Sequence, residues 1–237
     1  MQKTGLTIVK VGGAIVEDEA QLAQLLHDFS VIEGPKVLVH GGGRRATAVA
    51  SKLGIESQMV NGRRITDAQM LEVVTMVYGG LVNKNLVARL QALGINALGL
   101  TGADINCLLS RKRPIKDGID YGFVGDVERA DGKGNILNTN ADTIAAETAK
   151  ALAPFYDVTL IYCFEKSGVL ANPDDDSSVI PLITHADFDR LVADGTVAGG
   201  MIPKIQNALS AIDAGVARVI ITKATAIDGK SGTVIQS

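Results

Sequence analysis

Short apolar runs rich in β-branched residues alternate along the chain with stretches that have the periodicity of amphipathic helices. The apolar runs, each four to six residues long, predict strands at Leu6–Val11, Lys36–Val39, Ala97–Leu100, Val158–Cys163 and Arg218–Thr222. Apolar residues spaced three or four apart predict helices at Ala20–Phe29, Ala46–Leu53, Ala68–Ala92, Ala141–Leu152, His185–Ala193 and Ile205–Ala214. This alternation predicts an α/β fold in which a parallel sheet is covered on both faces.

Composition narrows the class of protein further. With 237 residues, of which 46% are hydrophobic, the chain can bury a sizeable core as one large domain or two lobes. Lys and Arg total 23 against 26 Asp and Glu, and no basic stripe is present, which argues against a nucleic-acid surface. The first apolar stretch spans only about six residues and is broken by Lys10, too short for a signal peptide or membrane span. We therefore expect a cytoplasmic protein.

The cysteines and histidines give no sign of a metal site. Cys107 and Cys163 lie far apart in the sequence without metal-ligand spacing, and the three histidines are scattered. This arrangement suits reduced, buried thiols better than a disulfide framework, and we expect no metal held by protein ligands.

Two glycine-rich turns follow the first two predicted strands. Gly12 and Gly13 come after the first strand, and Gly41, Gly42 and Gly43 after the second. In parallel sheets ligands bind beyond the carboxyl ends of the strands, and consecutive glycines can direct several backbone amides at one anion. An ordinary tight turn explains either glycine pair taken alone, but two at equivalent places favour a ligand. Neither a Walker sequence nor a protein-kinase motif set is present.

Several polar residues lie at positions where an apolar residue would be expected. Lys10 ends the first apolar strand, Asn138, Asn140 and Asp142 crowd the start of an Ala-rich helix, and Lys204 follows a glycine pair. Taken singly, each has a structural explanation: an edge lysine that extends to solvent, ordinary helix caps and a surface lysine. Together they supply cations, amides and a carboxylate suited to an amino-acid or phosphate ligand.

Eight blocks, in order from Val9 to about Leu209, resemble the acetylglutamate kinases of the amino-acid kinase family: KVGGA, LVHGGG, NGRRIT, ALGLTGAD, YGFVGDV, LNTNAD, SGVL and AGGMIPKIQNAL. The resemblance implies a three-layer αβα sandwich with a mostly parallel central sheet. It also implies an N-terminal lobe over residues 1–150 that binds acylglutamate and dimerises, and a C-terminal lobe over residues 151–237 that binds ATP. The substrate would be an N-acyl-L-glutamate, phosphorylated on its γ-carboxylate, in the second step of arginine biosynthesis.

The resemblance assigns roles to the polar residues. Lys10 and Lys204 would stabilise negative charge on the transferring phosphoryl group, and Asp142 would orient the two lysines, which suits the need of phosphoryl transfer for positioned cations. The substrate would be bound by Gly42, Gly43, Arg64, Asn138 and Asn140. The nucleotide would be bound by Gly12, Gly13, Glu165, Lys166, Gly168, Val197 and Ala198, with Mg²⁺ carried in by ATP rather than held in a protein cage.

The chain departs from the family pattern at two places that matter for the fold and the nucleotide site. After Ala130 the usual members continue with a helix and an apolar strand, whereas Asp131-Gly132-Lys133-Gly134 follows here at once. Either the chain has lost a core strand or the sequence as it stands lacks a stretch. The second is favoured because a deleted central strand would expose two ladder edges. In the nucleotide loop, Glu165 occupies the place of the usual Thr-Asp pair.

A third departure concerns the acyl group. Arg44 and Arg45 follow the glycine turn and Arg63 precedes Arg64, where the usual members carry uncharged residues. Arginines that point to solvent are one explanation. The other is a second carboxylate on the acyl group, as in N-succinyl-L-glutamate, since these blocks look most like members from Bacteroidetes-type bacteria, whose arginine pathway is thought to use succinylated intermediates.

Two alternatives to an acylglutamate kinase are other kinases of the same fold and a non-catalytic sensing module. Kinases of carbamate, glutamate, aspartate and uridylate share the first lysine and the glycine turns but fit the NGRRIT and NTNAD blocks poorly. A non-catalytic sensing module of the same fold would be expected to lack Lys10, Lys204 or Asp142, and all three are present. Arginine-inhibited members carry an extra N-terminal helix, so we expect a homodimer insensitive to arginine. The apolar positions of helix Ala68–Ala92 suit a two-fold contact and simple core packing equally well.

Overall fold

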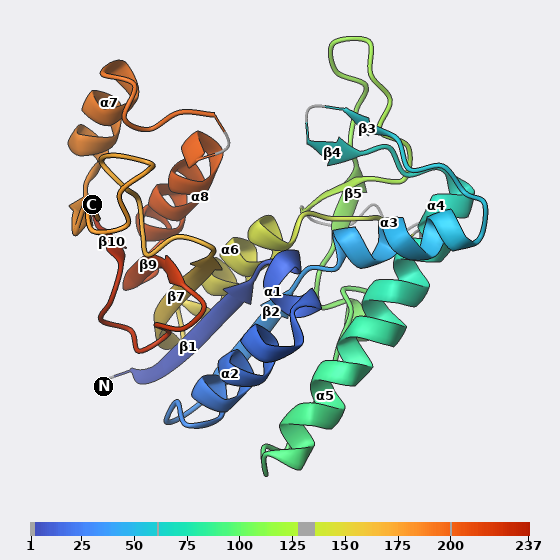
Figure 1. Cartoon of the computed structure of the whole chain (residues 1–237), viewed down its shortest axis with the longest axis horizontal. Coiled ribbons are helices and arrows are strands. Elements are labelled where there is room, and N and C mark those ends of the chain that lie inside the picture. The colour runs from blue at the N-terminus through green and yellow to red at the C-terminus, as the bar shows by residue number, and fades with distance from the viewer. Residues whose placement is uncertain (1–2, 61, 128–135, 200) are drawn as a thin grey trace. The chain divides into compact units, whose positions relative to one another are not determined.

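A computed structural model describes residues 3–60, 62–127, 136–199 and 201–237 (Figure 1). The chain divides into two compact units, Met1–His40 with Ala141–Ser237 and Gly41–Asn140. This division differs from a boundary at residue 150, because the chain leaves the first unit after residue 40 and returns to it at residue 141. The assignment of substrate and ATP to separate lobes stays a prediction.

The first unit is built on a six-stranded sheet (Figure 1). Its strand order is β2 (Lys36–His40), β1 (Thr4–Val11), β7 (Tyr156–Phe164), β9 (Arg218–Lys223), β10 (Thr233–Ile235) and β8 (Leu182–Ile183). All neighbours are parallel except β9 and β10. Four predicted strands are confirmed to within two residues at each end, because β1, β7 and β9 are nearly continuous apolar runs buried on both faces.

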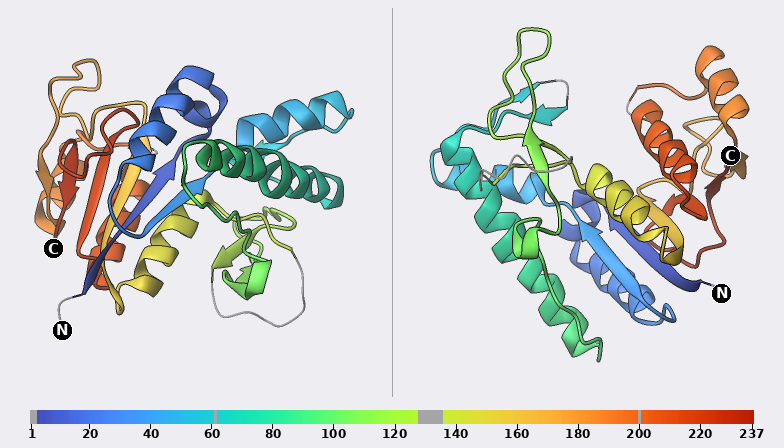
Figure 2. Two further views of the ribbon diagram at one scale, coloured as in Figure 1. Left: turned by 90° about the horizontal axis from the view of Figure 1, so that it is seen from below. Right: turned by 180° about the vertical axis from the view of Figure 1, so that it is seen from behind.

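Helices cover both faces of this sheet. α6 (Ala141–Leu152) and α8 (Met201–Asp213) lie on one face, and α1 (Gly13–Glu17) and α2 (Glu19–Ser30) on the other (Figure 2). Small residues of α6 and α8, among them Ala145, Ala149 and Ala208, bring the helices close to Leu160 and Ile221 of the sheet. The arrangement confirms the αβα sandwich with a mostly parallel sheet.

Capping side chains fix where two helices of the first unit start. The Asp18 side chain accepts hydrogen bonds from the backbone N–H groups of Ala20 and Gln21, which caps α2. At α7 (His185–Ala193), Thr184 and Asp187 form a reciprocal capping box. The predicted bounds of α7 are confirmed at both ends.

The second unit combines helices with two short antiparallel strand pairs. Its elements are α3 (Gly43–Lys52), β3 (Met59–Val60), β4 (Arg63–Arg64), α4 (Ala68–Thr75), the π-helix η1 (Met76–Val82), α5 (Asn83–Ala92), the 3₁₀ helix η2 (Asp104–Asn106), β5 (Ser110–Lys112) and β6 (Gly125–Val127). β3 pairs with β4, and β5 with β6. The short strands carry no long apolar alternation, which is why the sequence pattern did not predict them.

The predicted helix Ala68–Ala92 is interrupted by the π-helix η1. Buried positions recur at Met70, Val73, Val74 and Val77, and then resume at Val82, Leu86 and Leu90. Regular α-helical spacing would have buried Leu81, which is instead 40% exposed. The wider π-turns therefore absorb one extra residue between two apolar stripes that would otherwise be out of phase.

The strand predicted at Ala97–Leu100 does not form. Leu98 is 82% exposed, and no strand pairs with this segment within the described part of the chain. Side chains of α5 bind its carbonyl groups instead: Gln91 donates to Ala97 O, and Lys84 donates to Gly99 O at 2.9 Å. The apolar run was suited to a strand, but among the described residues it has no strand beside it.

The two cysteines differ in their surroundings. Both are free thiols, but only Cys163 is buried, whereas Cys107 is exposed, so the prediction of two buried thiols is wrong for Cys107. Burial raises the pKa of Cys163 to about 12, against a smaller lowering by the charge of Lys10. Separately, none of the described helices has the length and apolar character needed to cross a membrane.

Candidate active site

Lys10 and Asp142 form an ion pair at the carboxyl end of β1. Only 7% of Lys10 is exposed, and its Nζ lies 2.6 Å from Oδ1 of Asp142 in the first turn of α6. A lysine this deeply placed needs a partner, and a carboxylate is favoured near a helix N-terminus. Lys10 is therefore a paired internal cation rather than an edge residue reaching into solvent.

Lys204 reaches the same part of this unit from α8. Its Nζ stands 3.9 Å from the ring centroid of Phe164, and the Nζ of Lys10 stands 5.5 Å from that centroid. Tyr162 stacks on Phe164 with centroids 6.2 Å apart and donates a hydrogen bond to the backbone oxygen of Asp142. The Phe164 ring at the end of β7 thus lies near both ammonium groups, where the ring face attracts a cation.

The charges around Lys204 have opposing effects on its pKa. Burial is the largest and lowers the pKa of Lys204 below that of a free lysine, Asp142 raises it, Lys10 lowers it and Glu165 raises it. Each effect is what charge and desolvation require. The cluster holds two ammonium groups that share the influence of Asp142, so it can attract an anion such as a phosphate group.

Arg64 is the main cation of the second unit's polar site. It is 8% exposed, and its Nη1 donates to Ser57 Oγ at 2.7 Å while Nη2 donates to Gly43 O at 2.9 Å and to Thr47 Oγ1 at 2.8 Å. Within the described residues Arg64 forms no ion pair. Its charge is therefore not neutralised by a carboxylate, which suits it to an anionic ligand.

The Gly42–Gly43 turn lies at the start of α3, directly beside Arg64. Gly42 is the N-cap residue of this helix and makes no side-chain cap, so the backbone N–H groups of the first turn have no capping side chain at that position. A Cβ on Gly42 would lie 2.9 Å from Cδ1 of Tyr78, which explains why glycine stands there. Backbone amides and a buried guanidinium thus gather at one helix N-terminus.

Asn138 belongs to the same unit but is held by backbone pairing. Its N–H donates to Phe123 O at 2.8 Å, its carbonyl accepts from Gly125 N, and its Nδ2 donates to Thr66 Oγ1 at 3.1 Å. Asn140 is exposed two residues later. A role for either amide in substrate binding stays a prediction.

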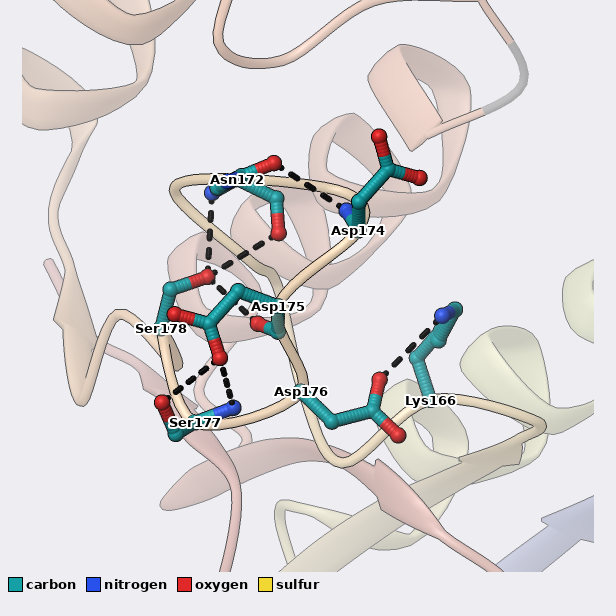
Figure 3. A network of polar contacts seen from close by, with 7 residues as sticks. All are labelled: Lys166, Asn172, Asp174, Asp175, Asp176, Ser177 and Ser178. Atoms are coloured by element: carbon teal, nitrogen blue, oxygen red, sulfur yellow. Dashed lines mark hydrogen bonds and ion pairs between the residues drawn. The ribbon is translucent and has the colours of Figure 1, made fainter.

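The residues predicted to bind nucleotide lie in loops of the first unit. Gly12 is the N-cap residue of α1 and Gly13 its first residue. Glu165 follows β7 and acts on the pKa of Lys204. Figure 3 shows Lys166 paired with Asp176 of the loop Asn172–Ser178, with 3.1 Å between Nζ and Oδ1, both side chains being exposed.

The other predicted nucleotide residues are partly accounted for by packing. A Cβ on Gly168 would lie 2.8 Å from Thr233 Oγ1, and the Val197 side chain is buried in the core. Any contact of Val197 with nucleotide would therefore use its backbone. Ala198 is exposed, and so are the arginines that raised the question of a second carboxylate, Arg44, Arg45 and Arg63.

Sequence reasoning missed the aromatic and hydroxyl side chains that surround the predicted cations. Phe164 and Tyr162 accompany the lysines, and Thr47, Ser57 and Tyr78 accompany Arg64. The position of Phe164 at the carboxyl end of a buried strand was a usable signal. The hydroxyl residues gave none, since serine, threonine and tyrosine are ordinary in helices and loops. Within the residues that the structure describes, no group of three His, Cys, Asp or Glu side chains is arranged to hold a metal ion.

The model of the amino acid kinase family matches residues 5–223. An acetylglutamate kinase of Phocaeicola vulgatus is 63% identical over 99% of this chain and 99% of its own length, and one of Cytophaga hutchinsonii is 50% identical over 96% and 94%. The first alignment extends over 256 positions, so about 20 of them have no counterpart in this 237-residue chain.

Solved structures share the fold. The smu.665 protein of Streptococcus mutans gives a TM-score of 0.74 at 27% identity, covering 98% of each chain. A carbamate kinase of Giardia lamblia gives 0.60 at 15% identity, covering 100% of this chain and 99% of that one, which supports the fold alone. The chain therefore belongs to the amino acid kinase family and groups over its whole length with the acetylglutamate kinases.

Proposed function

We propose that this protein transfers the γ-phosphoryl group of ATP to the γ-carboxylate of N-acetyl-L-glutamate, forming an acyl phosphate in arginine biosynthesis. The observation that carries the proposal is the convergence of Lys10, Asp142 and Lys204 in one unit, in a chain 63% identical to an acetylglutamate kinase. Phosphoryl transfer depends mainly on positioned cations, and two lysines near one carboxylate supply them.

In the proposed reaction a γ-carboxylate oxygen of acylglutamate attacks the γ-phosphorus, and the bond from that phosphorus to the bridging oxygen breaks to release ADP. Lys10 and Lys204 stabilise the charge that develops on the phosphoryl oxygens. Asp142 keeps Lys10 fixed through the 2.6 Å ion pair and favours the charged form of Lys204. The Phe164 ring, in contact with both ammonium groups, restricts their positions.

For the substrate, we propose that the backbone amides of Gly42 and Gly43 bind the γ-carboxylate and that Arg64 binds the α-carboxylate, with Asn138 and Asn140 on the α-carboxylate or acyl amide. The support is the placement of Arg64 against the glycine turn and its lack of an ion-pair partner among the described residues. The terminal nitrogens of Arg64 bind protein oxygens, so a carboxylate that docked with two hydrogen bonds would replace some of these contacts.

For the nucleotide, we propose that Gly12, Gly13 and Gly168 approach the phosphates or sugar through their backbones, with Glu165, Lys166, Val197 and Ala198 beside them. Mg²⁺ bound to ATP would neutralise part of the phosphate charge. Glu165, exposed at the end of β7, is the acidic group of this loop that already acts on Lys204.

We propose that the protein works in the cytoplasm as a homodimer. The segment α4–η1–α5 offers a self-complementary contact, because Met76 and Leu81 are large apolar side chains exposed on it. Light scattering of the purified protein tests the stoichiometry, with Leu81→Glu expected to shift it toward monomer.

A coupled assay of ADP release tests the main proposal, with N-acetyl-L-glutamate, N-succinyl-L-glutamate and L-glutamate compared at matched ATP and Mg²⁺. Turnover of N-acetyl-L-glutamate is expected, and absence of turnover with every acylglutamate would disprove the kinase proposal. A sensing module of the same fold would bind acylglutamate in calorimetry without releasing ADP.

The same assay decides the acyl group. If the enzyme prefers N-succinyl-L-glutamate and Arg44→Ala, Arg45→Ala or Arg63→Ala lowers that preference by about 10-fold or more, an arginine reads a second carboxylate. Unchanged preference in all three variants would mean that these exposed arginines serve solubility.

A further inference from the structure

Tyr78 lies over the glycine turn of the second unit. A Cβ on Gly42 would be 2.9 Å from Cδ1 and 3.2 Å from Cε1 of the Tyr78 ring. A Cβ on Gly43 would be 3.9 Å from Oη of Tyr78 and 4.0 Å from Nη2 of Arg64. The ring therefore packs on Gly42, and the hydroxyl and the guanidinium approach the same point above Gly43.

The hydroxyl of Tyr78 has a proton available for a ligand. The positive charge of Arg64 lowers the pKa of Tyr78, and a guanidinium has no acceptor atom, so Arg64 cannot take up the phenolic proton. Burial raises the pKa of Tyr78 more than Arg64 lowers it, which keeps the phenol protonated at neutral pH. Among the residues that the structure describes, none accepts the Tyr78 proton.

The other hydroxyls around Arg64 are used differently. Thr47 accepts from Arg64 and donates its own proton to Gly43 O at 3.1 Å, so its proton is used within α3. Ser57 accepts from Nη1 on the other side of the guanidinium. Tyr78 is thus the hydroxyl that approaches the point above Gly43 with an unused proton.

The π-helix η1 positions Tyr78 over the glycine turn. η1 (Met76–Val82) is inserted between two ordinary helices whose buried stripes it brings back into phase at Val82. Such π-turns cost backbone regularity and often mark functional sites. Gly79 and Gly80 follow Tyr78 directly, and a Cβ on Gly79 would lie 3.0 Å from Thr101 Cγ2.

We infer that the Tyr78 hydroxyl donates to the same acylglutamate carboxylate as Arg64, which makes Tyr78 a further substrate-binding residue. The inference rests on the proposed function, because acylglutamate is taken as the ligand. A neutral phenol beside an arginine adds a second, differently directed donor, and this fixes the rotation of a bound carboxylate that Arg64 alone would leave free.

The test is Tyr78→Phe, which keeps the ring against Gly42 and removes only the hydroxyl. The KM for N-acetyl-L-glutamate should rise about 10-fold or more, the range for a hydrogen bond to a charged group, while the KM for ATP and the kcat stay within about 2-fold. The matched control is Tyr156→Phe at the amino end of β7, which should leave all three constants unchanged. In an Arg64→Ala background, Tyr78→Phe should change the KM for N-acetyl-L-glutamate by less than about 2-fold, because Arg64 no longer holds the carboxylate to which Tyr78 donates.

Two results would overturn the inference while leaving the kinase proposal intact: a parent-like KM for acylglutamate in Tyr78→Phe, or equal rises in the KM for both substrates. If the parent protein turns over no acylglutamate, the kinase proposal fails first. Calorimetry with N-acetyl-L-glutamate then decides the inference by itself, since weaker binding by Tyr78→Phe supports it and absent or equal binding refutes it.

Discussion

The two units of the molecule hold their buried cations in different ways. In the first, Lys10 is paired with Asp142, and Lys204 feels the same carboxylate. In the second, Arg64 is surrounded by a carbonyl group and hydroxyls, and within the described residues it has no acidic partner. One site carries its own counter-charge and the other does not.

This difference separates two tasks that a phosphotransferase needs. Lysines held by a carboxylate keep a fixed position and can respond to charge that appears only during transfer, which is transition-state stabilisation. An arginine with neutral partners keeps its full charge for a ground-state anion. The comparison predicts that variants in the first unit lower kcat and that variants in the second raise KM.

The largest expected effect is that of Arg64→Ala. Loss of the guanidinium should weaken acylglutamate binding by about 2 to 4 kcal/mol, seen as a higher KM, because a desolvated charge pair is lost. The KM for ATP should move little. Arg64→Lys is the matched control, keeping the charge but not the fork that reaches both Ser57 and Gly43. Equal effects on both substrates would show that Arg64 serves the fold instead.

Lys204→Ala is expected to lower kcat by about 100-fold or more with the KM for acylglutamate nearly unchanged. The reason is loss of a cation that acts on charge developing in the transition state. Lys150→Ala is a suitable control, since the Lys150 ammonium binds Glu147 and Ser210. Turnover within a few-fold of the parent would remove Lys204 from the mechanism.

Asp142→Asn should cost about 2 kcal/mol of unfolding free energy, because it leaves the ammonium of Lys10 buried without its counter-charge. Urea denaturation measures this loss. Lys166→Ala provides the contrast, since its ion pair with Asp176 is exposed and is worth at most about 0.5 kcal/mol. A parent-like stability of Asp142→Asn would mean that solvent reaches Lys10.

The smallest effect concerns pH. Since burial lowers the pKa of Lys204, kcat should begin to fall at a pH below 10.5, the value for an unperturbed lysine. Between the folded and unfolded pKa values the unfolded chain binds more protons, so the Lys204 contribution to stability rises with pH while activity falls. Lys204→Met should abolish this stability increase. A kcat that stays level to pH 10.5 would contradict the lowered pKa.

The sequence predicted the parts of the fold that depend on local periodicity. The strands β1, β2, β7 and β9 and the helix α7 follow from apolar patterning and capping residues. The choice of Lys10, Asp142 and Lys204 came from the family resemblance, and the structure places these residues together, although their catalytic roles stay predictions.

The elements that the sequence did not predict depend on contacts with residues distant in the chain. Ala97–Leu100 is apolar enough for a strand, but a strand needs a neighbour, and the relatives carry about 20 aligned positions that this chain lacks. Among the described residues, β2 is an edge strand of the sheet in the first unit. The π-helix could not be predicted from the sequence either, because Leu81 and Val82 are both apolar and only packing decides which of them is buried.

The difference in exposure between the two thiols allows one of them to be labelled selectively with a dye. A maleimide dye reacts with thiolate, so Cys163, buried and with a pKa of about 12, should stay unmodified while exposed Cys107 is labelled. Mass spectrometry of the native protein should therefore find a single adduct, in the unit Gly41–Asn140. Paired with a fluorescent ATP analogue, that one dye would report by energy transfer how far the labelled unit stands from bound nucleotide during turnover.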